Sequence, residues 1–321
     1  MSDNKLIKFE KGLIKRVEDI LDLTDKVLIG DTIPNAKFYF ERAEKKRHDG
    51  DYHGAIADHN LAIELDSHFF ESYTYRGYAK EKVKDYYGCI EDCTKSIEIE
   101  PNQSDAFVGR GNARYHIQDF IGCINDYSIV IKSNPSFSTA FWIRGMCKEN
   151  LGAANDAIED FGKVIDLRGD LVPSAYVHRA ACKLSIRDFK GSIEDFTMAI
   201  DLNEDVFIER GVAKHQMGNY RSAIEDYTTA IARNSNAEHL KFAYDKRGRA
   251  KEEMRDYTGS IEDYTKAVEI DPTFGMAYKN RGFAFKELGK LKEACINWKK
   301  AAEFGDEEGL KMVQKFCANL L

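Results

Sequence analysis

The chain has 321 residues, of which 43% are hydrophobic and 31% are charged. This is enough apolar material for a folded core and too much for an intrinsically disordered chain. The formal net charge is −7 and the isoelectric point lies near 5.7, so no overall basic field favours binding to nucleic acid or to anionic lipid.

The first thirty residues break every apolar run with a charged side chain. This argues against a secretory signal peptide, and no later segment has the length and apolarity of a membrane span. Residues 4–28 instead predict an amphipathic helix, which we expect to cap the structure that follows. A dimer contact through the same helix is the alternative. Its apolar face would consist of Leu6, Phe9, Leu13, Val17, Ile20 and Leu21.

From residue 36 onward the chain repeats at a period of about 34 residues. Apolar and small residues recur at three- and four-residue steps on both sides of a break such as "MGN", which predicts two helices per repeat. In each repeat a small residue follows an arginine, and we call it the register mark. A second small residue comes twelve positions after this mark. Four positions further on lies a ring or another core residue such as Tyr127 or Trp298. All five prolines fall at repeat boundaries. The register marks are Ala43, Gly77, Gly111, Gly145, Ala180, Gly211, Gly248 and Gly282.

The stretches "RGFAFKELGKLKEACINWKKA" and "RGVAKHQMGNYRSAIEDYTTAI" resemble the tetratricopeptide repeat. The resemblance implies an all-α, right-handed superhelical solenoid of antiparallel helix pairs. It also implies that the first helix of each pair lines the inner, ligand-facing wall. We expect an N-terminal capping helix and linker at 1–35, eight repeats at 36–304, and a C-terminal capping helix at 305–321. The last helix would begin after an N-cap at Asp306, with Leu310, Val313, Phe316 and Leu320 on its apolar face.

In repeats 1 to 7 an aspartate lies sixteen residues after the arginine that precedes the register mark. In repeat 8 an asparagine takes this position. The turn between the helices lies near the midpoint, so antiparallel packing predicts an ion pair within each repeat. A recurring pair of this kind is explained by packing and weakens any catalytic reading of the "ED" motif. The arginines are Arg42, Arg76, Arg110, Arg144, Arg179, Arg210, Arg247 and Arg281, and their partners are Asp58, Asp92, Asp126, Asp160, Asp195, Asp226, Asp263 and Asn297.

No motif predicts catalysis, a metal or a cofactor. Seven cysteines, an odd number, argue against a disulfide framework and favour a reducing, cytoplasmic compartment. Cys89 and Cys93 lie one helical turn apart but lack a second pair of zinc ligands. His178 and Cys182 have the same spacing, without a third orienting group.

We therefore expect a non-catalytic scaffold that binds a peptide or helical segment of a protein partner. Rings on the first helices of repeats 2 to 5 would form the site, although they could instead pack under neighbouring helices. A helical-repeat protein that binds nucleic acid, or a self-assembling structural subunit, is the alternative; the acidic charge argues against nucleic acid, and we expect no membrane partner. The candidate ligand-binding residues are Tyr75, Tyr78, Asn112, Tyr115, His116, Trp142, Met146 and His178.

The same wall in repeats 6 to 8 is more polar. In this family, a clamp of Lys, Asn, Asn, Lys and Arg on three consecutive repeats grips the carboxylates of chaperone tails. No window of this chain fills more than one of those positions, so we expect no such clamp. Repeats 6 to 8 carry Ile208, Val212, Lys246, Met276 and Asn280 there, and their wall also includes Glu209, Asp245, Arg249 and Lys279.

Overall fold

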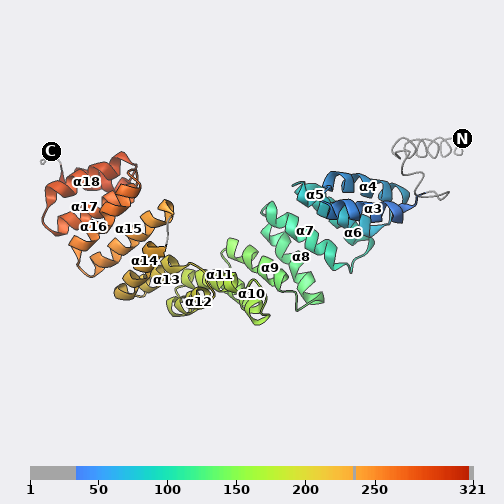
Figure 1. The fold of residues 1–321 in the computed structure, drawn as a ribbon, viewed down its shortest axis with the longest axis horizontal. Helices are drawn as coiled ribbons and strands as arrows, with labels where there is room; N and C mark the ends of the chain where they lie inside the picture. Colours follow the sequence, from blue (N-terminus) through green and yellow to red (C-terminus); the bar gives the residue numbers. More distant parts are fainter. Residues whose placement is uncertain (1–33, 234–235, 318–321) are drawn as a thin grey trace. The chain divides into compact units, whose positions relative to one another are not determined.

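The computed structural model describes residues 34–233 and 236–317. Within these residues it contains seventeen α-helices and no strand, so the predicted all-α class is confirmed. The amphipathic helix expected at 4–28 lies outside the described residues. The first sixteen helices form eight successive pairs, which are the eight predicted repeats, and α19 follows them (Figure 1).

The chain divides into two compact units, with the boundary between Val130 and Ile131, inside α8. Unit 1 holds repeats 1 to 3 up to this boundary, and unit 2 holds the remainder. The helices of unit 1 are α3 (Ala36–His48), α4 (Tyr52–Leu65), α5 (Phe70–Lys82), α6 (Tyr86–Ile99), α7 (Ser104–His116) and α8 (Phe120–Ser133), whose last residues belong to unit 2.

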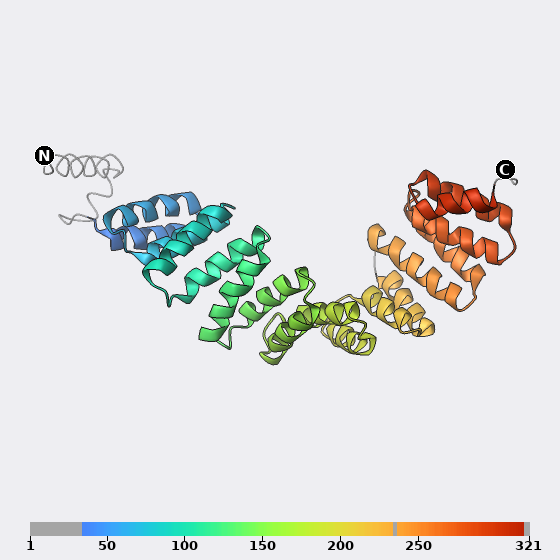
Figure 2. The same cartoon turned by 180° about the vertical axis from the view of Figure 1, so that it is seen from behind.

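Unit 2 continues the alternation of first and second helices, and each helix is followed closely by its partner (Figure 2). Its helices are α9 (Ser138–Asn150), α10 (Ala154–Asp166), α11 (Val172–Ser185), α12 (Phe189–Asp201), α13 (Phe207–Gln216), α14 (Tyr220–Arg233), α15 (Ala237–Glu253), α16 (Tyr257–Ile270), α17 (Gly275–Glu287), α18 (Leu291–Glu303) and α19 (Glu307–Phe316).

Five second helices begin with the same local turn, written "DYHG", "DYYG", "DFIG", "DFKG" and "DYTG" in the sequence. The aspartate side chain accepts a hydrogen bond from the amide of the glycine three residues later, at 2.9 Å in the case of Asp51 and Gly54. This bond satisfies one of the free N–H groups at the helix start. A Cβ atom on Gly54 would lie only 2.0 Å from the Asp51 carboxylate, so the tight cap requires glycine there.

The glycine at the register mark lets the two helices of a repeat approach each other. In repeat 6 a Cβ atom on Gly211 would lie 2.6 Å from the Tyr227 ring, and in repeat 7 one on Gly248 would lie 2.8 Å from Tyr264. Both rings are 0% exposed. The predicted small-to-ring contact is therefore the core of the repeat, and its close packing leaves no room for a methyl group.

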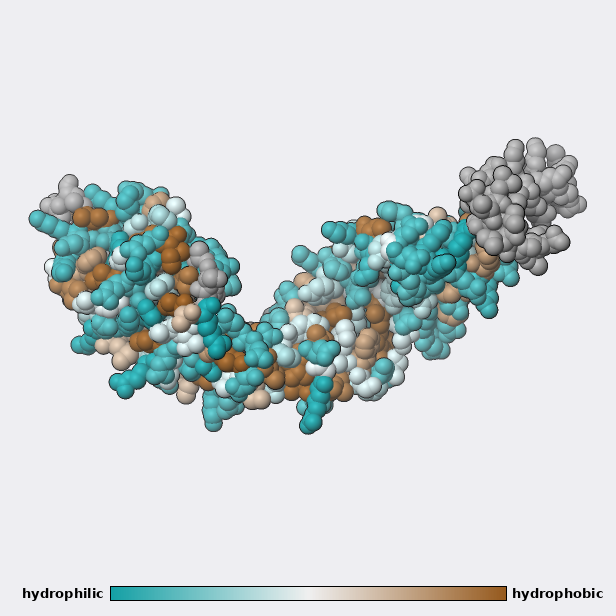
Figure 3. Space-filling view, in the orientation of Figure 1, coloured by the Kyte–Doolittle hydropathy of each residue, from teal (hydrophilic) through white to brown (hydrophobic). Residues whose placement is uncertain are grey.

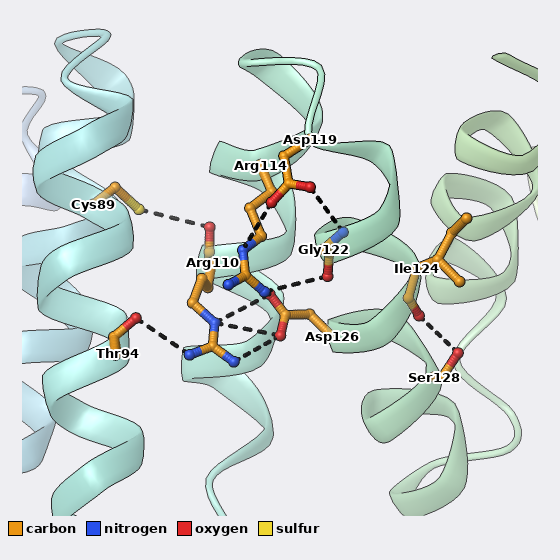
Figure 4. A network of polar contacts seen from close by, with 10 residues as sticks. Cys89, Thr94, Arg110, Arg114, Asp119, Gly122, Ile124, Asp126 and Ser128 are labelled. Carbon is orange, nitrogen blue, oxygen red and sulfur yellow. Dashed lines mark hydrogen bonds and ion pairs between the residues drawn. The ribbon is translucent and has the colours of Figure 1, made fainter. Parts of the chain in front are cut away.

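The predicted arginine–aspartate pair is present in all seven repeats that have both residues, and Arg281 donates to Asn297 at 2.7 Å. A second cation, four residues after the arginine, also binds the carboxylate. Figure 4 shows this arrangement in repeat 3, where Arg110 and Arg114 both approach Asp126 at 2.8 Å. The carboxylate is 1% exposed, so it is buried with two cations rather than one.

At the C-terminal end, Asp306 caps α19 by accepting from the Gly309 amide at 2.8 Å. Val313 and Phe316 pack against the cluster around Trp298, whereas Leu310 is 49% exposed, so its expected place on the packed face is wrong. Leu320 lies outside the described residues. Cys295 and Cys317 form a disulfide between α18 and the end of α19, a link that the odd cysteine count did not predict.

No helix among residues 34–233 and 236–317 combines the length and the apolarity needed to cross a bilayer. Figure 3 shows hydrophilic residues over most of the visible surface, with hydrophobic residues in separate groups.

Candidate ligand-binding face

The candidate residues lie on one side of the first helices, which contact one another from repeat to repeat inside each unit: α5 meets α7, α13 meets α15, and α15 meets α17. Side chains at the predicted positions join these helices. The His178 ring lies 2.8 Å from the Glu149 carboxylate of the preceding first helix, and Asn280 donates to Asp245 at the same distance. We call this side the first-helix face.

In unit 1 the candidates divide into structural and accessible residues. Tyr78 is structural: its hydroxyl donates to the backbone of Asp105 at 2.7 Å, and its ring fills the space where a Cβ atom on Gly109 would lie. Asn112 accepts from the buried Tyr127 at 2.6 Å. His116 is exposed and stacks on Tyr86, with ring centroids 4.6 Å apart.

The other two candidates of unit 1, Tyr75 and Tyr115, are half-buried. The Tyr75 ring meets the Phe40 ring of the preceding first helix at 5.7 Å and the Tyr78 ring at the same distance. Arg47 lies over the Tyr75 ring, 5.5 Å from its centroid. These contacts hold the ring in place while part of it stays accessible to a ligand.

In unit 2, Trp142, Met146 and His178 are half-buried and belong to one cluster. Trp142 packs against the buried Phe161 at 5.5 Å and edge-on against His178 at 5.1 Å. Both open interpretations of Trp142 therefore hold in part: one side of the indole supports the core, and the remainder is accessible.

The arrangement of His178 does not favour a nucleophilic thiol at Cys182. The imidazole Nδ1 is held by Glu149, and Cys182 is 3% exposed. Burial raises the pKa of Cys182 to about 12, and the Glu149 charge adds to this, so the thiol stays protonated. Cys89 and Cys93 are both fully buried, with their Sγ atoms 3.9 Å apart.

A cavity of about 100 Å³ opens on the first-helix face between α13 and α15 of unit 2. The Nε2 atom of His215, which lines it, is buried and has no hydrogen-bond partner among the described residues. Burial lowers the pKa of this histidine, and Arg249 and Lys246 lower it further, against the opposing charge of Glu253. The cavity is lined by Val212, His215, Gln216, Tyr227, Lys246 and Arg249.

Helix α15, which carries Arg249, also carries two carboxyl groups near it, those of Asp245 and Glu252. Asp245 is 0% exposed; it accepts from Asn280, and its other oxygen has no partner in the described part of the chain. Burial raises its pKa. Burial also raises the pKa of Glu252 to about 7, helped by Asp245 and opposed by the Tyr264 hydroxyl, which donates at 2.7 Å, and by Arg249. Burial thus shifts both groups toward the neutral form.

The sequence indicated that this wall was polar, but it did not single out His215 or the cavity. The available signal was positional. His215 occupies the same register position in repeat 6 as Tyr115 does in repeat 3, five residues after the arginine. Lys246 and Arg249 occupy the positions of Tyr75 and Tyr78.

Residues 204–236 and 243–274, which cover repeats 6 and 7, match the model of a tetratricopeptide repeat family. These two repeats are tetratricopeptide repeats. The resemblance expected from the sequence is thereby confirmed, and the sixteen paired helices show the same hairpin unit along the described chain. No curated protein matches the chain at a significant level.

Solved structures of other tetratricopeptide repeat proteins share the fold. The C-terminal part of a repeat-containing protein from Cytophaga hutchinsonii is 16% identical, with 75% of this chain and 99% of that chain covered and a TM-score of 0.63. MamA from Desulfovibrio magneticus, from residue 41 to its end, is 19% identical over 55% of this chain and 97% of its own, with a TM-score of 0.50. A chain of the APC/C hetero-tetramer Cut9–Hcn1 is 11% identical, over 83% of this chain and 52% of its own, also with a TM-score of 0.50.

Proposed function

We propose that the protein is a non-catalytic scaffold that binds a peptide or a helical segment of a partner protein on its first-helix face. The observation that carries the proposal is a difference in burial within the repeats. The packing rings, such as Tyr127 and Phe161, are fully buried, whereas Tyr75 and Trp142 keep part of their surface accessible. The tetratricopeptide fold, found also in the Cut9–Hcn1 assembly, supports a role in protein association.

Half-buried rings are suited to recognition. Their neighbours already restrict their rotamers, so little conformational entropy is lost when a ligand covers them, and each ring offers a large apolar area. In unit 1 the rings of Tyr75 and Tyr115 and the exposed imidazole of His116 would contact the partner. In unit 2 the same role falls to Trp142 and Met146, with His178 fixed by Glu149 at their side.

Capture of partners by the immobilised protein tests the proposal. We expect Tyr75→Ala with His116→Ala, or Trp142→Ala alone, to remove captured partners while the helical circular dichroism is retained. Tyr87→Ala is the matched control, because Tyr87 is a ring on a second helix that is 71% exposed. Tyr78 is not a suitable target, since its loss would leave a hole under Gly109. Equal capture by all variants would contradict the proposed site.

A further inference from the structure

We propose that the cavity between α13 and α15 binds the carboxylate of an acidic side chain in the partner peptide, through Lys246, Arg249 and His215. This inference rests on the proposed function and names one feature of the ligand. It places an acidic residue of the peptide at repeats 6 and 7 of unit 2.

The cations of the first helices differ in whether the fold pairs them. Cations of the first helices are mostly used by the fold: in repeat 7, Arg247 and Lys251 both bind Asp263, at 2.6 and 2.9 Å. By contrast, neither Lys246 nor Arg249 has an ion pair or a hydrogen bond from its side chain among residues 34–233 and 236–317. Their charges face a cavity instead of a structural carboxylate.

The Nε2 atom of His215 is buried beside these two cations without a hydrogen-bond partner in the described residues, and a buried polar atom of this kind is costly. A carboxylate oxygen in the cavity would accept from Nε2–H and from the two cations at the same time. The resulting bonds would be charge-assisted and therefore strong.

Three acidic side chains lie near the cavity: Asp245, Glu252 and Glu253. Burial raises the pKa of Asp245 and of Glu252, which weakens the negative charge that they set against the two cations. Glu253 is the remaining nearby carboxylate and is exposed. Lys246 and Arg249 line the cavity, whereas none of these three acids belongs to its lining. Two cations and the Nε2 atom of His215, unpartnered in the part of the chain that the structure describes, match the single charge and the two acceptor oxygens of a carboxylate.

The test uses two capped amino acids that differ in one group: N-acetyl-glutamate N-methylamide and N-acetyl-glutamine N-methylamide. Each is titrated into the full chain at low salt, with the labelled His215 ring followed by NMR and assigned with His215→Gln. We expect the glutamate compound to give saturable shifts. Lys246→Gln and Arg249→Gln should each weaken its binding by about tenfold to a hundredfold, the order expected for one charge-assisted hydrogen bond.

Arg221→Gln is the matched control, since this exposed arginine is in α14, outside the cavity lining. Equal binding of the glutamine compound, a shift that does not saturate, or a response to inorganic phosphate alone would overturn the inference. Failure of the proposed function has a different signature: the glutamate compound would still bind, but no partner would be lost on substitution of Tyr75, His116 or Trp142. If the cavity alone is misassigned, those substitutions still remove the partner.

Discussion

The buried carboxylate with two cations gives a quantitative prediction in repeat 4. Asp160, 2% exposed, accepts from Arg144 at 2.7 and 2.9 Å and from Lys148 at 2.7 Å. Asp160→Asn keeps the size and one acceptor oxygen but removes the negative charge. Two cations would then share a neutral amide. We expect Asp160→Asn to destabilise unit 2 clearly.

The magnitude follows from the burial of the three groups. An exposed ion pair contributes about 0–1 kcal/mol, whereas breaking a buried pair costs about 3–5 kcal/mol. The side chains of Arg144 and Lys148 are 17% and 16% exposed, so water compensates part of the loss. We expect a loss of about 2–4 kcal/mol in the free energy of unfolding.

Repeat 8 shows how the charges are coupled. There Asn297 stands in the aspartate position, and Phe285 stands where the other repeats have the second cation. Lys148→Met should therefore reduce the cost of Asp160→Asn. The double variant should be more stable than the sum of the two single changes predicts, by at least about 1 kcal/mol.

Urea unfolding followed by circular dichroism measures these differences, and hydrogen exchange of the α9 and α10 amides reports them locally if repeats unfold separately. Lys163→Met is the control, because the Lys163–Asp166 pair is 62% and 72% exposed and should contribute less than about 0.5 kcal/mol. A cost for Asp160→Asn no larger than that of the control, or additive effects in the double variant, would refute the reasoning.

Four further predictions follow from the contacts. The folded pKa of Glu252, about 7, exceeds the value of 4.5 in the unfolded chain, so its stabilising contribution is complete below pH 4.5 and is lost as the pH rises through 7. Glu252→Gln should remove this loss. Urea unfolding should show that the free energy of unfolding of this variant exceeds that of the wild type by about 1–3 kcal/mol at pH 8, and by less at pH 5.5. Gly211→Ala should destabilise by about 1–3 kcal/mol through its clash with Tyr227, whereas Gly162→Ala, whose Cβ would meet nothing closer than 3.6 Å, should stabilise by about 0.5–1 kcal/mol; reversed signs in thermal melts would contradict the packing argument. Cys317→Ser opens a link between residues 22 positions apart and should cost about 2–4 kcal/mol, with hydrogen-exchange protection lost first in α19. Deletion of residues 1–33 should promote aggregation, as light scattering would show, if this segment covers apolar surface of repeat 1.

The sequence was sufficient for the elements that the repeat period imposes. The helix pairs, the glycine-to-ring contacts and the arginine–aspartate pairs all recur in register, and each recurrence tests the same geometry again. The second cation recurs as regularly, as Lys80 and Lys148 for example and as Arg114 in repeat 3, but cations on a helix surface are commonly solvated. Only the structure shows it turned onto the aspartate.

The candidate face could be predicted in position but not in burial. Tyr75 and Tyr78 lie three residues apart on α5, and from the sequence either ring could be accessible or packed under a neighbouring helix. Both are half-buried, and which of them packs against the next repeat depends on Gly109, whose missing side chain makes room for Tyr78. The cavity near His215 likewise requires α13 and α15 together. No single repeat contains that information.

The departures from the repeat pattern indicate which residues serve another purpose. In repeat 8 Phe285 occupies the cation position. Together with Met312 and Phe316 of α19, it packs against the cluster around Trp298. An apolar side chain is needed there because α19, not another repeat, covers this end. The loss of the cation also removes the need for a carboxylate, which explains Asn297. By the same argument, Lys246 and Arg249 are cations at positions where the repeat requires none, which supports the ligand proposed for them.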